Sequence, residues 1–214
     1  MVFEIKHQES YSRAELLLRF FFGAFYIVLP HIFLLMFVGI AAQFIILIAF
    51  FAVLFTGSFP QSMFVFVEKY LRWNLRVNAR LWNLCDGYPA FGLDAEDEYV
   101  RFEVEYPEKL SRGLALLKFF LGGFYCALPH VFVLMFRLIA NAVLRIAAFW
   151  VVLFTGAYPE SWHNFNVGTL RWVNRVNLYL LFMTDQYPPF TGMRLPEEEA
   201  AARGGMDVAD HLQR

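Results

Sequence analysis

The sequence has little charge, and almost none of that charge lies in its two apolar blocks. Only 17% of the 214 residues are Asp, Glu, Lys or Arg, whereas soluble domains average about 25%. The blocks, Leu16–Gly57 and Leu114–Gly156, contain no acidic residue. At 59% hydrophobic residues, so short a chain has more apolar side chain than a core can bury. The composition therefore excludes an ordinary soluble domain and predicts an integral membrane protein.

The sequence also lacks the motifs of common active sites. Its two cysteines, Cys85 and Cys126, have no CxxC partner, so neither a disulfide framework nor a zinc site is indicated. It has no nucleophile elbow, no phosphate-binding glycine loop, and no carboxylate pair in the apolar blocks. We therefore expect a protein that is not an enzyme, with no cofactor, no metal and no nucleic-acid partner.

An internal duplication organises the chain. At a constant offset of 99 residues, FFFGAFYIVLPHIFLLMF (Phe20–Phe37) aligns with FFLGGFYCALPHVFVLMF (Phe119–Phe136), and VLFTGSFP (Val53–Pro60) aligns with VLFTGAYP (Val152–Pro159). The segments LRWNLRVN and LRWVNRVN, then CDGYPAF and TDQYPPF, continue the same alignment. Such self-similarity indicates tandem copies of one structural unit. The predicted organisation is a first hairpin repeat at 1–93, an acidic linker at 94–101, a second hairpin repeat at 102–192 and a polar tail at 193–214.

The same order of elements is predicted in both repeats. Alternating stretches at Val2–Gln8 and Tyr99–Pro107 are typical of short strands. Ser12 and Ser111 then offer N-caps for an apolar segment of roughly 40 residues, about twice the length of one membrane span. We therefore predict a transmembrane helical hairpin, with a tight turn near Gly39–Gln43 in the first copy. A hairpin that enters the membrane without fully crossing it is the alternative.

Proline and glycine mark two further points in each copy. Pro30 and Pro129 are predicted to kink the first arm of the hairpin, because proline has no backbone donor. Gly57 and Gly156 stand where a glycine C-cap would end the second arm. Little fixed structure is expected for the polar tail, from Pro196 onward.

An amphipathic helix is predicted after each hairpin, at Gln61–Leu84 and Glu160–Met183. In the first copy, cationic residues recur every three or four positions, and an apolar face with Phe66 and Trp73 lies opposite. This pattern is typical of helices that lie in the membrane interface, although a helix packed on its own hairpin would share it. The cationic residues are Lys69, Arg72, Arg76 and Arg80. The predicted fold class is thus an all-α integral membrane protein.

The cationic residues also predict an orientation. An even number of membrane arms in each repeat places the termini and the linker on one side. All Lys and Arg residues except Arg137 and Arg145 then fall on that side, and the positive-inside rule makes it cytoplasmic. We expect a multi-pass protein of the cell inner membrane, with both termini cytoplasmic and with repeats related by a pseudo-twofold axis along the membrane normal.

The motifs EYPEKLSR, LPHxFxLMF, FTGxYP, LRWxxRV and TDxYPPF together resemble a bacterial membrane-protein family known as domain of unknown function 4389. The resemblance covers both repeats, and the second copy is the closer match. In the first copy, His7 and Gln8 replace the Tyr-Pro pair, and Gly87 and Ala90 replace residues of the last motif. The family has no assigned activity, so the resemblance implies a fold and a membrane location only.

Two histidines, His31 and His130, occupy equivalent places inside the apolar blocks, each directly after a proline. Ionisable residues at membrane depth are functional candidates, so a proton or substrate relay, or a cofactor held between the two copies, is one interpretation. The alternative is that each imidazole bonds the carbonyl that its neighbouring proline leaves free.

A second group of candidates is charged and repeats in both copies. A carboxylate at a helix end is disfavoured by the helix dipole, so the two aspartates are expected to pair with arginines. The group either forms an ion-pair clamp or binds anionic lipid head groups through its surplus arginines. Its members are Arg13, Arg72, Arg76 and Asp86, with Arg112, Arg171, Arg175 and Asp185.

The second apolar block carries a polar stripe, Arg137, Asn141 and Arg145, that the first block lacks. It is interpreted as a partner contact or a pore mouth. The leading functional hypothesis is a protein that organises lipid or partner proteins at the cytoplasmic leaflet, with membrane lipids, a second copy or another membrane protein as its partner. The rival is an oligomeric channel or small transporter.

Overall fold

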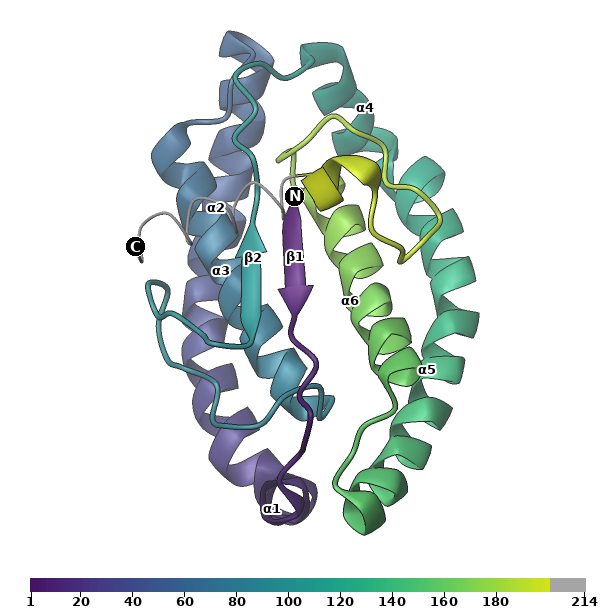
Figure 1. Ribbon diagram of the computed structural model, residues 1–214. Helices are drawn as coiled ribbons and strands as arrows, with labels where there is room; N and C mark the ends of the chain where they lie inside the picture. Colours follow the sequence, from purple (N-terminus) through teal and green to yellow (C-terminus); the bar gives the residue numbers. More distant parts are fainter. Residues whose placement is uncertain (201–214) are drawn as a thin grey trace, which may run out of the picture.

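The computed structural model describes residues 1–200 as a mostly helical molecule with two repeat-like halves (Figure 1). The first half contains β1 (Val2–Ile5), α1 (Arg13–Gly23), the π-helix η1 (Ala24–Val28), α2 (Leu29–Thr56) and α3 (Gln61–Leu81). The second half contains β2 (Val100–Glu103), α4 (Arg112–Gly122), the π-helix η2 (Gly123–Ala127), α5 (Leu128–Thr155) and α6 (Glu160–Leu180). The predicted strands are confirmed, and the order of elements is the same in both halves.

The predicted hairpins are wrong. Each apolar block is one unbroken helical segment of 44 residues, Arg13–Thr56 or Arg112–Thr155, long and apolar enough to cross a membrane. No turn forms near Gly39, because this glycine serves packing instead: a Cβ there would lie 3.1 Å from the hydroxyl of Tyr70 on α3. The helix α2 therefore runs through this position without a break.

Both ends of these long segments are capped as predicted. The hydroxyls of Ser12 and Ser111 each accept a hydrogen bond, 3.3 Å long, from the backbone amide three residues later. Gly57 and Gly156 end the segments with φ angles of 78° and 77°, a left-handed conformation that glycine adopts without a steric penalty.

The proline kinks are also present, and each has a partner that was not predicted. Pro30 cannot donate a hydrogen bond to the carbonyl of Tyr26 four residues earlier, and the π-helix η1 lies at this point. The free carbonyl accepts a bond of 2.8 Å from the hydroxyl of Tyr88. In the second copy, Tyr187 donates to the carbonyl of Tyr125 at 3.1 Å. Each tyrosine begins a Tyr-Pro-x-Phe sequence, here called the YPxF segment, at Tyr88–Phe91 or Tyr187–Phe190. The tyrosine of each YPxF segment thus stabilises a kink.

The two strands form one antiparallel sheet in which the halves meet. Val2 pairs with Glu103 and Phe3 pairs with Phe102, and Phe102 is the repeat equivalent of Phe3. An antiparallel pair of equivalent residues defines a local pseudo-twofold axis perpendicular to the sheet. In Figure 1, α2 accordingly runs upward while α5 runs downward.

Each strand segment packs on the other half of the molecule. The segment that contains β1 lies against α6 and the end of α5, whereas the segment that contains β2 lies against α3 and the end of α2. The hydrogen bonds of this exchange include Arg171 to the Phe3 carbonyl (3.4 Å), Tyr11 to the Gly156 carbonyl (2.8 Å), Arg72 to the Phe102 carbonyl (2.8 Å) and Leu110 to the Gly57 carbonyl (2.7 Å). The main apolar core likewise mixes residues of both halves.

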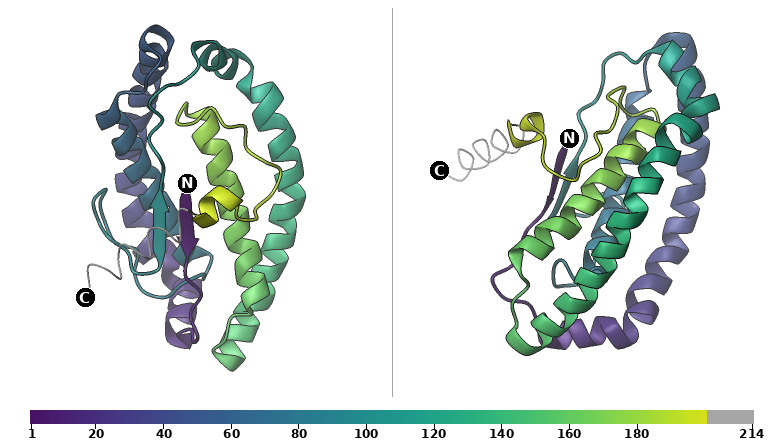
Figure 2. Two further views of the ribbon diagram at one scale, coloured as in Figure 1. Left: turned by 45° about the horizontal axis from the view of Figure 1, so that its top comes forward. Right: turned by 90° about the vertical axis from the view of Figure 1, so that its right-hand side faces the viewer.

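Helices form where amphipathic helices were predicted, as α3 and α6, and both pack within the molecule. In Figure 2, α6 lies between the strand β1 and the long helix α5, and most of its residues are buried. The pattern that predicted an interfacial helix therefore belongs to the middle layer of the fold. The cationic faces of α3 and α6 contact the linker and residues 191–198, respectively.

Candidate functional site

The two long apolar segments present a continuous outer surface without charge. Within 16–55 and 114–154, no charged residue is exposed, and Gln43 is the one exposed polar side chain. Elsewhere in the described chain, only five large hydrophobic side chains are exposed. They are Tyr88, Phe91, Tyr187, Phe190 and Met193. Water-soluble monomers rarely expose an apolar patch of more than a few hundred Å², so this surface needs a nonpolar environment.

All four cationic residues of the apolar segments turn away from that surface. Each one bonds a polar group of the inner layers, so the outer face stays free of charge. Arg19 bonds Asp86 (2.7 Å), Lys118 bonds Asp185 (2.9 Å), Arg137 bonds the Thr169 hydroxyl (2.9 Å), and Arg145 bonds the Leu81 carbonyl (3.1 Å). Asn141, the third member of the predicted polar stripe, bonds Asn166 on α6.

The histidines lie in two separate aromatic clusters, one in each half. Nδ1 of His31 accepts a hydrogen bond of 2.9 Å from the indole of Trp73 on α3, and the imidazole stacks on Phe91 at 3.9 Å between ring centroids. His130 accepts the same bond from Trp172 at 2.9 Å. One interpretation of the sequence was that each imidazole bonds the carbonyl freed by its neighbouring proline. The structure contradicts it, because tyrosine hydroxyls bond those carbonyls.

This geometry favours a packing role for both histidines. They belong to different core clusters, so the two imidazoles do not share a cofactor position. Among residues 1–200, no group of three metal-ligating side chains comes together. Each His–Trp bond instead fastens a long outer helix to the helix of the middle layer, while the stacked phenylalanine holds the YPxF segment in place.

The cationic stripe of α3 is covered by the acidic linker. The Nη atoms of Arg80 contact both carboxylate oxygens of Asp97, at 2.8 and 3.0 Å, and the carboxylate side chain is 2% exposed. Arg76, fully buried, donates to the carbonyls of Gly92 and Ala95. Asp97 and the Ala95 carbonyl of the acidic linker thus satisfy this stripe, whereas Glu96 and Glu98 are exposed.

The two outer members of the stripe make more exposed contacts. Lys69 pairs with Asp94, and Arg72 pairs with Glu68 at 2.9 Å. Among the described residues of α3, every cation of the stripe thus has a partner within the chain. Binding of a lipid head group by these side chains would require the linker to leave first.

In the second half, residues 191–198 cover α6 in the same way. Arg175 bonds both carboxylate oxygens of Glu198, at 2.6 and 3.0 Å, and the carbonyls of Thr191 and Met193. Arg171 donates to the carbonyl of Gly192 at 2.7 Å. Residues 196–200 are helical, so this part of the tail is structured, contrary to the prediction. Residues 201–214 lie outside the described residues.

The remaining charged candidates, Arg13, Asp86, Arg112 and Asp185, make contacts at the ends of helices. Asp86 accepts from the backbone amide of Ser12 at 2.6 Å, and its arginine partner is Arg19. Arg13 donates to the carbonyl of Phe154 at the end of α5 (3.2 Å), a contact that also suits the helix dipole. In the second half, Asp185 accepts from Ser111 and pairs with Lys118, and Arg112 lies beside Gly57. The eight charged candidates thus form several local clamps.

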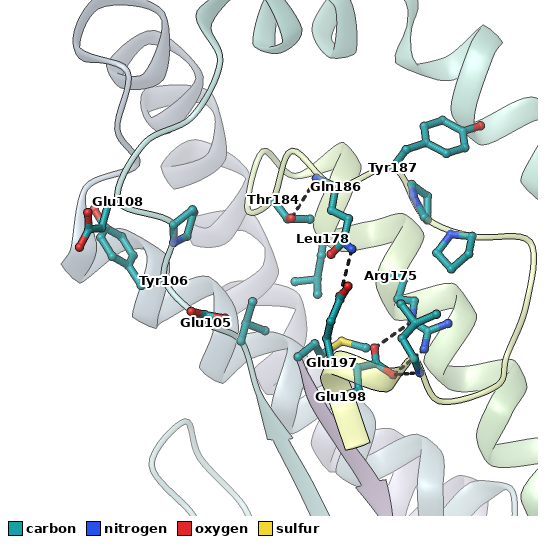
Figure 3. Close-up of a pocket in the computed structure, with 16 residues that line it drawn as sticks. Glu105, Tyr106, Glu108, Arg175, Leu178, Thr184, Gln186, Tyr187, Glu197 and Glu198 are labelled. Carbon is teal, nitrogen blue, oxygen red and sulfur yellow. Dashed lines mark hydrogen bonds and ion pairs between the residues drawn. The ribbon is translucent and has the colours of Figure 1, made fainter. Parts of the chain in front are cut away.

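A cavity of about 420 Å³ lies on the polar side, between residues 104–108 and the segment 184–198 (Figure 3). Its lining includes Glu105, Glu108 and Glu197. The cation at its wall, Arg175, is already neutralised by Glu198. Figure 3 shows these two side chains pointing toward each other, while Gln186 reaches Glu197 at 3.3 Å. The lining has no histidine, cysteine or serine, and its hydroxyl groups are those of Thr184, Tyr106 and Tyr187.

Two other reactive side chains are buried. Cys85 is fully buried, and burial raises the pKa of its thiol to about 12, which leaves it protonated and a poor nucleophile. His163 on α6 is 1% exposed, and its Nε2 bonds the carbonyl of Leu84 at 3.1 Å. Burial, with a smaller effect of the nearby His7, lowers the pKa of His163 to about 4.

The stability of the protein should therefore fall when the pH is lowered from about 6.5 toward 4. In this window the unfolded chain binds a proton at His163 that the folded chain does not, so acid favours unfolding. The shift from 6.5 to about 4 corresponds to a loss of about 3 kcal/mol at its maximum. Unfolding curves in a non-ionic detergent at several pH values measure the effect.

The repeat supplies the matched variant, because Phe64 stands at the equivalent position and is equally buried. His163→Phe should flatten the dependence of the unfolding free energy on pH between 4 and 6.5. An unchanged slope in this variant would assign the acid sensitivity to other groups.

The sequence identified the polar residues of the site but did not predict which side chains they contact. The partner of His31 lies 42 residues away, and that of Asp86 lies 67 residues away, beyond any local spacing rule. The sequence did point to Tyr88 and Tyr187, because both copies of the YPxF segment have a tyrosine at this position. The kinks that they stabilise follow from the prolines already identified.

The comparisons with known proteins agree with the repeat. The family described as Domain of unknown function (DUF4389) matches residues 13–92 and again residues 120–192. The comparisons with curated proteins and with solved structures found no match. The two matched segments cover more than half of the chain and correspond to its two halves, from the long apolar helix to the YPxF segment. The chain therefore belongs to the DUF4389 family, with the family's domain present in tandem duplication.

Proposed function

We propose that this protein is a non-enzymatic membrane protein that lies in one leaflet, with its polar face toward the cytoplasm, and organises the lipid around it. The observation that carries the proposal is the uncharged outer surface formed by residues 16–55 and 114–154. Acyl chains are the environment that suits a surface of this kind.

The length and placement of the elements favour an orientation in the leaflet over a crossing. Beyond the kink at Pro30, α2 has 28 residues and is about 42 Å long, which is longer than the hydrocarbon core of roughly 30 Å. The sheet lies near the mid-height of α2 and α5 in Figure 1, and its neighbours Glu96, Glu98 and Glu103 are exposed. If α2 and α5 crossed the bilayer, these carboxylates would stand at its centre, where charge is costly.

With the pseudo-twofold axis along the membrane normal, both halves meet lipid in the same way. The sheet, the linker and the cavity then face water, while the outer helices displace lipid from one leaflet only. Insertion of area on one side is how interfacial helices change the packing and curvature of a membrane. This supports lipid organisation as the function, with no transport path required through the molecule.

Cysteine labelling separates the two orientations. Ser58 and Ala157 are repeat equivalents just past α2 and α5, at opposite ends of the molecule in Figure 1. In a chain with Cys85 and Cys126 replaced by alanine, single cysteines at 58, 157 and 96 should all react with an impermeant reagent from the cytoplasmic side alone. Inverted and right-side-out membrane vesicles provide the two sides, and detergent provides full labelling as a control.

Labelling of positions 58 and 157 from opposite sides would establish a crossing and overturn the proposed orientation. Equal labelling from the periplasmic side only would keep the single-leaflet arrangement but reverse the proposed direction of the polar face.

A further inference from the structure

A groove of about 680 Å³ opens on the uncharged outer surface between α1 and α5. Leu17, Phe20 and Phe21 of α1 form one wall, and Ile146 and Trp150 of α5 form the other. The volume lies in the usual range for ligand pockets. Because the walls are apolar and the mouth opens on the surface that is proposed to meet lipid, the accessible occupant is an acyl chain.

The base of this groove is polar and positively charged. Arg145 lies there with its guanidinium 4.8 Å from the ring of Trp82. One hydrogen bond, to the carbonyl of Leu81, is the only one that it makes within residues 1–200. None of the ion pairs in the described chain includes it, whereas Arg19 and Lys118 both have carboxylate partners. Its remaining donors are therefore available to a ligand.

Asn83 adds a second polar group at the base. Its carbonyl oxygen accepts from Arg19 at 2.9 Å, which leaves its amide nitrogen as a donor toward the groove that it lines. A guanidinium and an amide together suit the oxygens of a phosphate group. No carboxylate lines the groove, so its charge is balanced only by an anion from outside the described chain.

The equivalent position in the other half lacks the polar pair. Ile46 replaces Arg145 and Phe182 replaces Asn83. Phe50 stacks on Phe119 at 4.3 Å and lies 5.5 Å from Phe182. The first of these contacts has a counterpart in the groove half, where the ring centroids of Phe20 and Phe149 lie 4.9 Å apart. The aromatic side chain that only the other half adds is therefore Phe182, at the position of Asn83.

We propose that the groove between α1 and α5 binds one anionic phospholipid of the surrounding leaflet. The acyl chain lies between Phe21 and Trp150, and the phosphate bonds Arg145 and the amide of Asn83. A lipid with a net charge of −1 neutralises the site, whereas a zwitterionic lipid brings a second cation that no acid of the groove can balance. The site rests on the proposed function, since it draws its ligand from the leaflet.

The test uses the full-length protein in a neutral detergent. Phosphatidylglycerol with brominated acyl chains is titrated against phosphatidylcholine with the same chains, and quenching of tryptophan fluorescence is followed. Trp150 lines the groove and Trp82 lies under Arg145, so phosphatidylglycerol should quench saturably and at lower concentration. Trp150→Phe should remove much of the quenching and thereby locate the lipid.

Arg145→Gln should weaken the apparent affinity for phosphatidylglycerol at least tenfold, the equivalent of about 1.4 kcal/mol, because a charged hydrogen bond is lost. Arg137→Gln is the matched control: this cation lies on the same helix but faces α6, and its loss should leave the affinity unchanged. Ala142→Trp, at an exposed position of the groove, should block binding without altering the interior.

Equal quenching by both lipids, or an affinity that Arg145→Gln and Ala142→Trp leave unchanged, would overturn the proposed site. The proposed function is judged separately. If the wild-type protein fails to insert into vesicles, the membrane location fails, whatever the titration in detergent shows. If Arg145→Gln inserts as the wild type does, the groove is a binding site within a protein that is otherwise held in the leaflet.

Discussion

Replacement of Arg175 by methionine is expected to lower the free energy of unfolding by about 3–5 kcal/mol, the usual cost of leaving one charge of a buried pair without its partner. Arg175 is 6% exposed and Glu198 is 7% exposed. Besides this carboxylate, the guanidinium bonds the carbonyls of Thr191 at 2.9 Å and Met193 at 2.7 Å. Methionine retains most of the apolar volume but none of the four hydrogen bonds.

Denaturant unfolding of the full chain in mild detergent, followed by circular dichroism, measures this loss. Lys69→Met is the matched control, because its partner Asp94 is 81% exposed and surface pairs contribute about 1 kcal/mol or less. The additional change Glu198→Gln should restore part of the stability by removing the unpaired charge. If Arg175→Met and Lys69→Met destabilise equally, the segment 191–198 is not fastened as the geometry indicates.

Separation of the chain after Glu98 should leave neither half able to fold alone. Each half would lose the strand segment that packs on it, together with the hydrogen bonds exchanged between the halves and part of a shared core. A half alone would also expose a sheet edge. Co-expressed halves, by contrast, carry every native contact except the single peptide bond that was cut.

We expect the two halves to co-purify in a 1:1 complex when expressed together, and to be degraded or aggregated when expressed singly. Size-exclusion chromatography and helical content by circular dichroism measure the outcome. Phe3→Asp in the first half is the control, because Phe3 pairs with Phe102 at the centre of the exchange, and it should abolish the complex. A first half that folds alone with native helical content would show that each repeat is an independent domain.

Much of the local structure could be predicted from the sequence. The duplication, both strands, the serine caps and the glycine ends at positions 57 and 156 all rest on signals from a few adjacent residues, and all are present. The hairpin turn failed because segment length was compared with bilayer thickness. Segment length does not show whether a segment is one helix or two, and Gly39 has a packing partner in Tyr70 that no spacing rule reveals.

The sequence predicted which residue types form the candidate site, but it did not predict which of them contact one another. The asymmetric stripe with Arg145 was visible in the alignment of the two copies. That Arg145 lies at the base of a groove formed with α1 depends on how the halves pack, which periodicity does not report. The basic face of α3 was identified correctly as a stripe, yet its partners come from the linker, since Asp97 lies 17 residues beyond Arg80.

The exchange of strands also sets an order of events during synthesis. The carbonyl of Phe3 receives its bond from Arg171, 168 residues later, and a ribosome that adds about 5–20 residues per second needs roughly 10–30 seconds to make that stretch. During this interval the first strand has left the ribosome, while the helix that will receive it does not yet exist. The first strand can pair with β2 once residue 103 has been made, but its packing on α6 is among the last contacts of the fold to form.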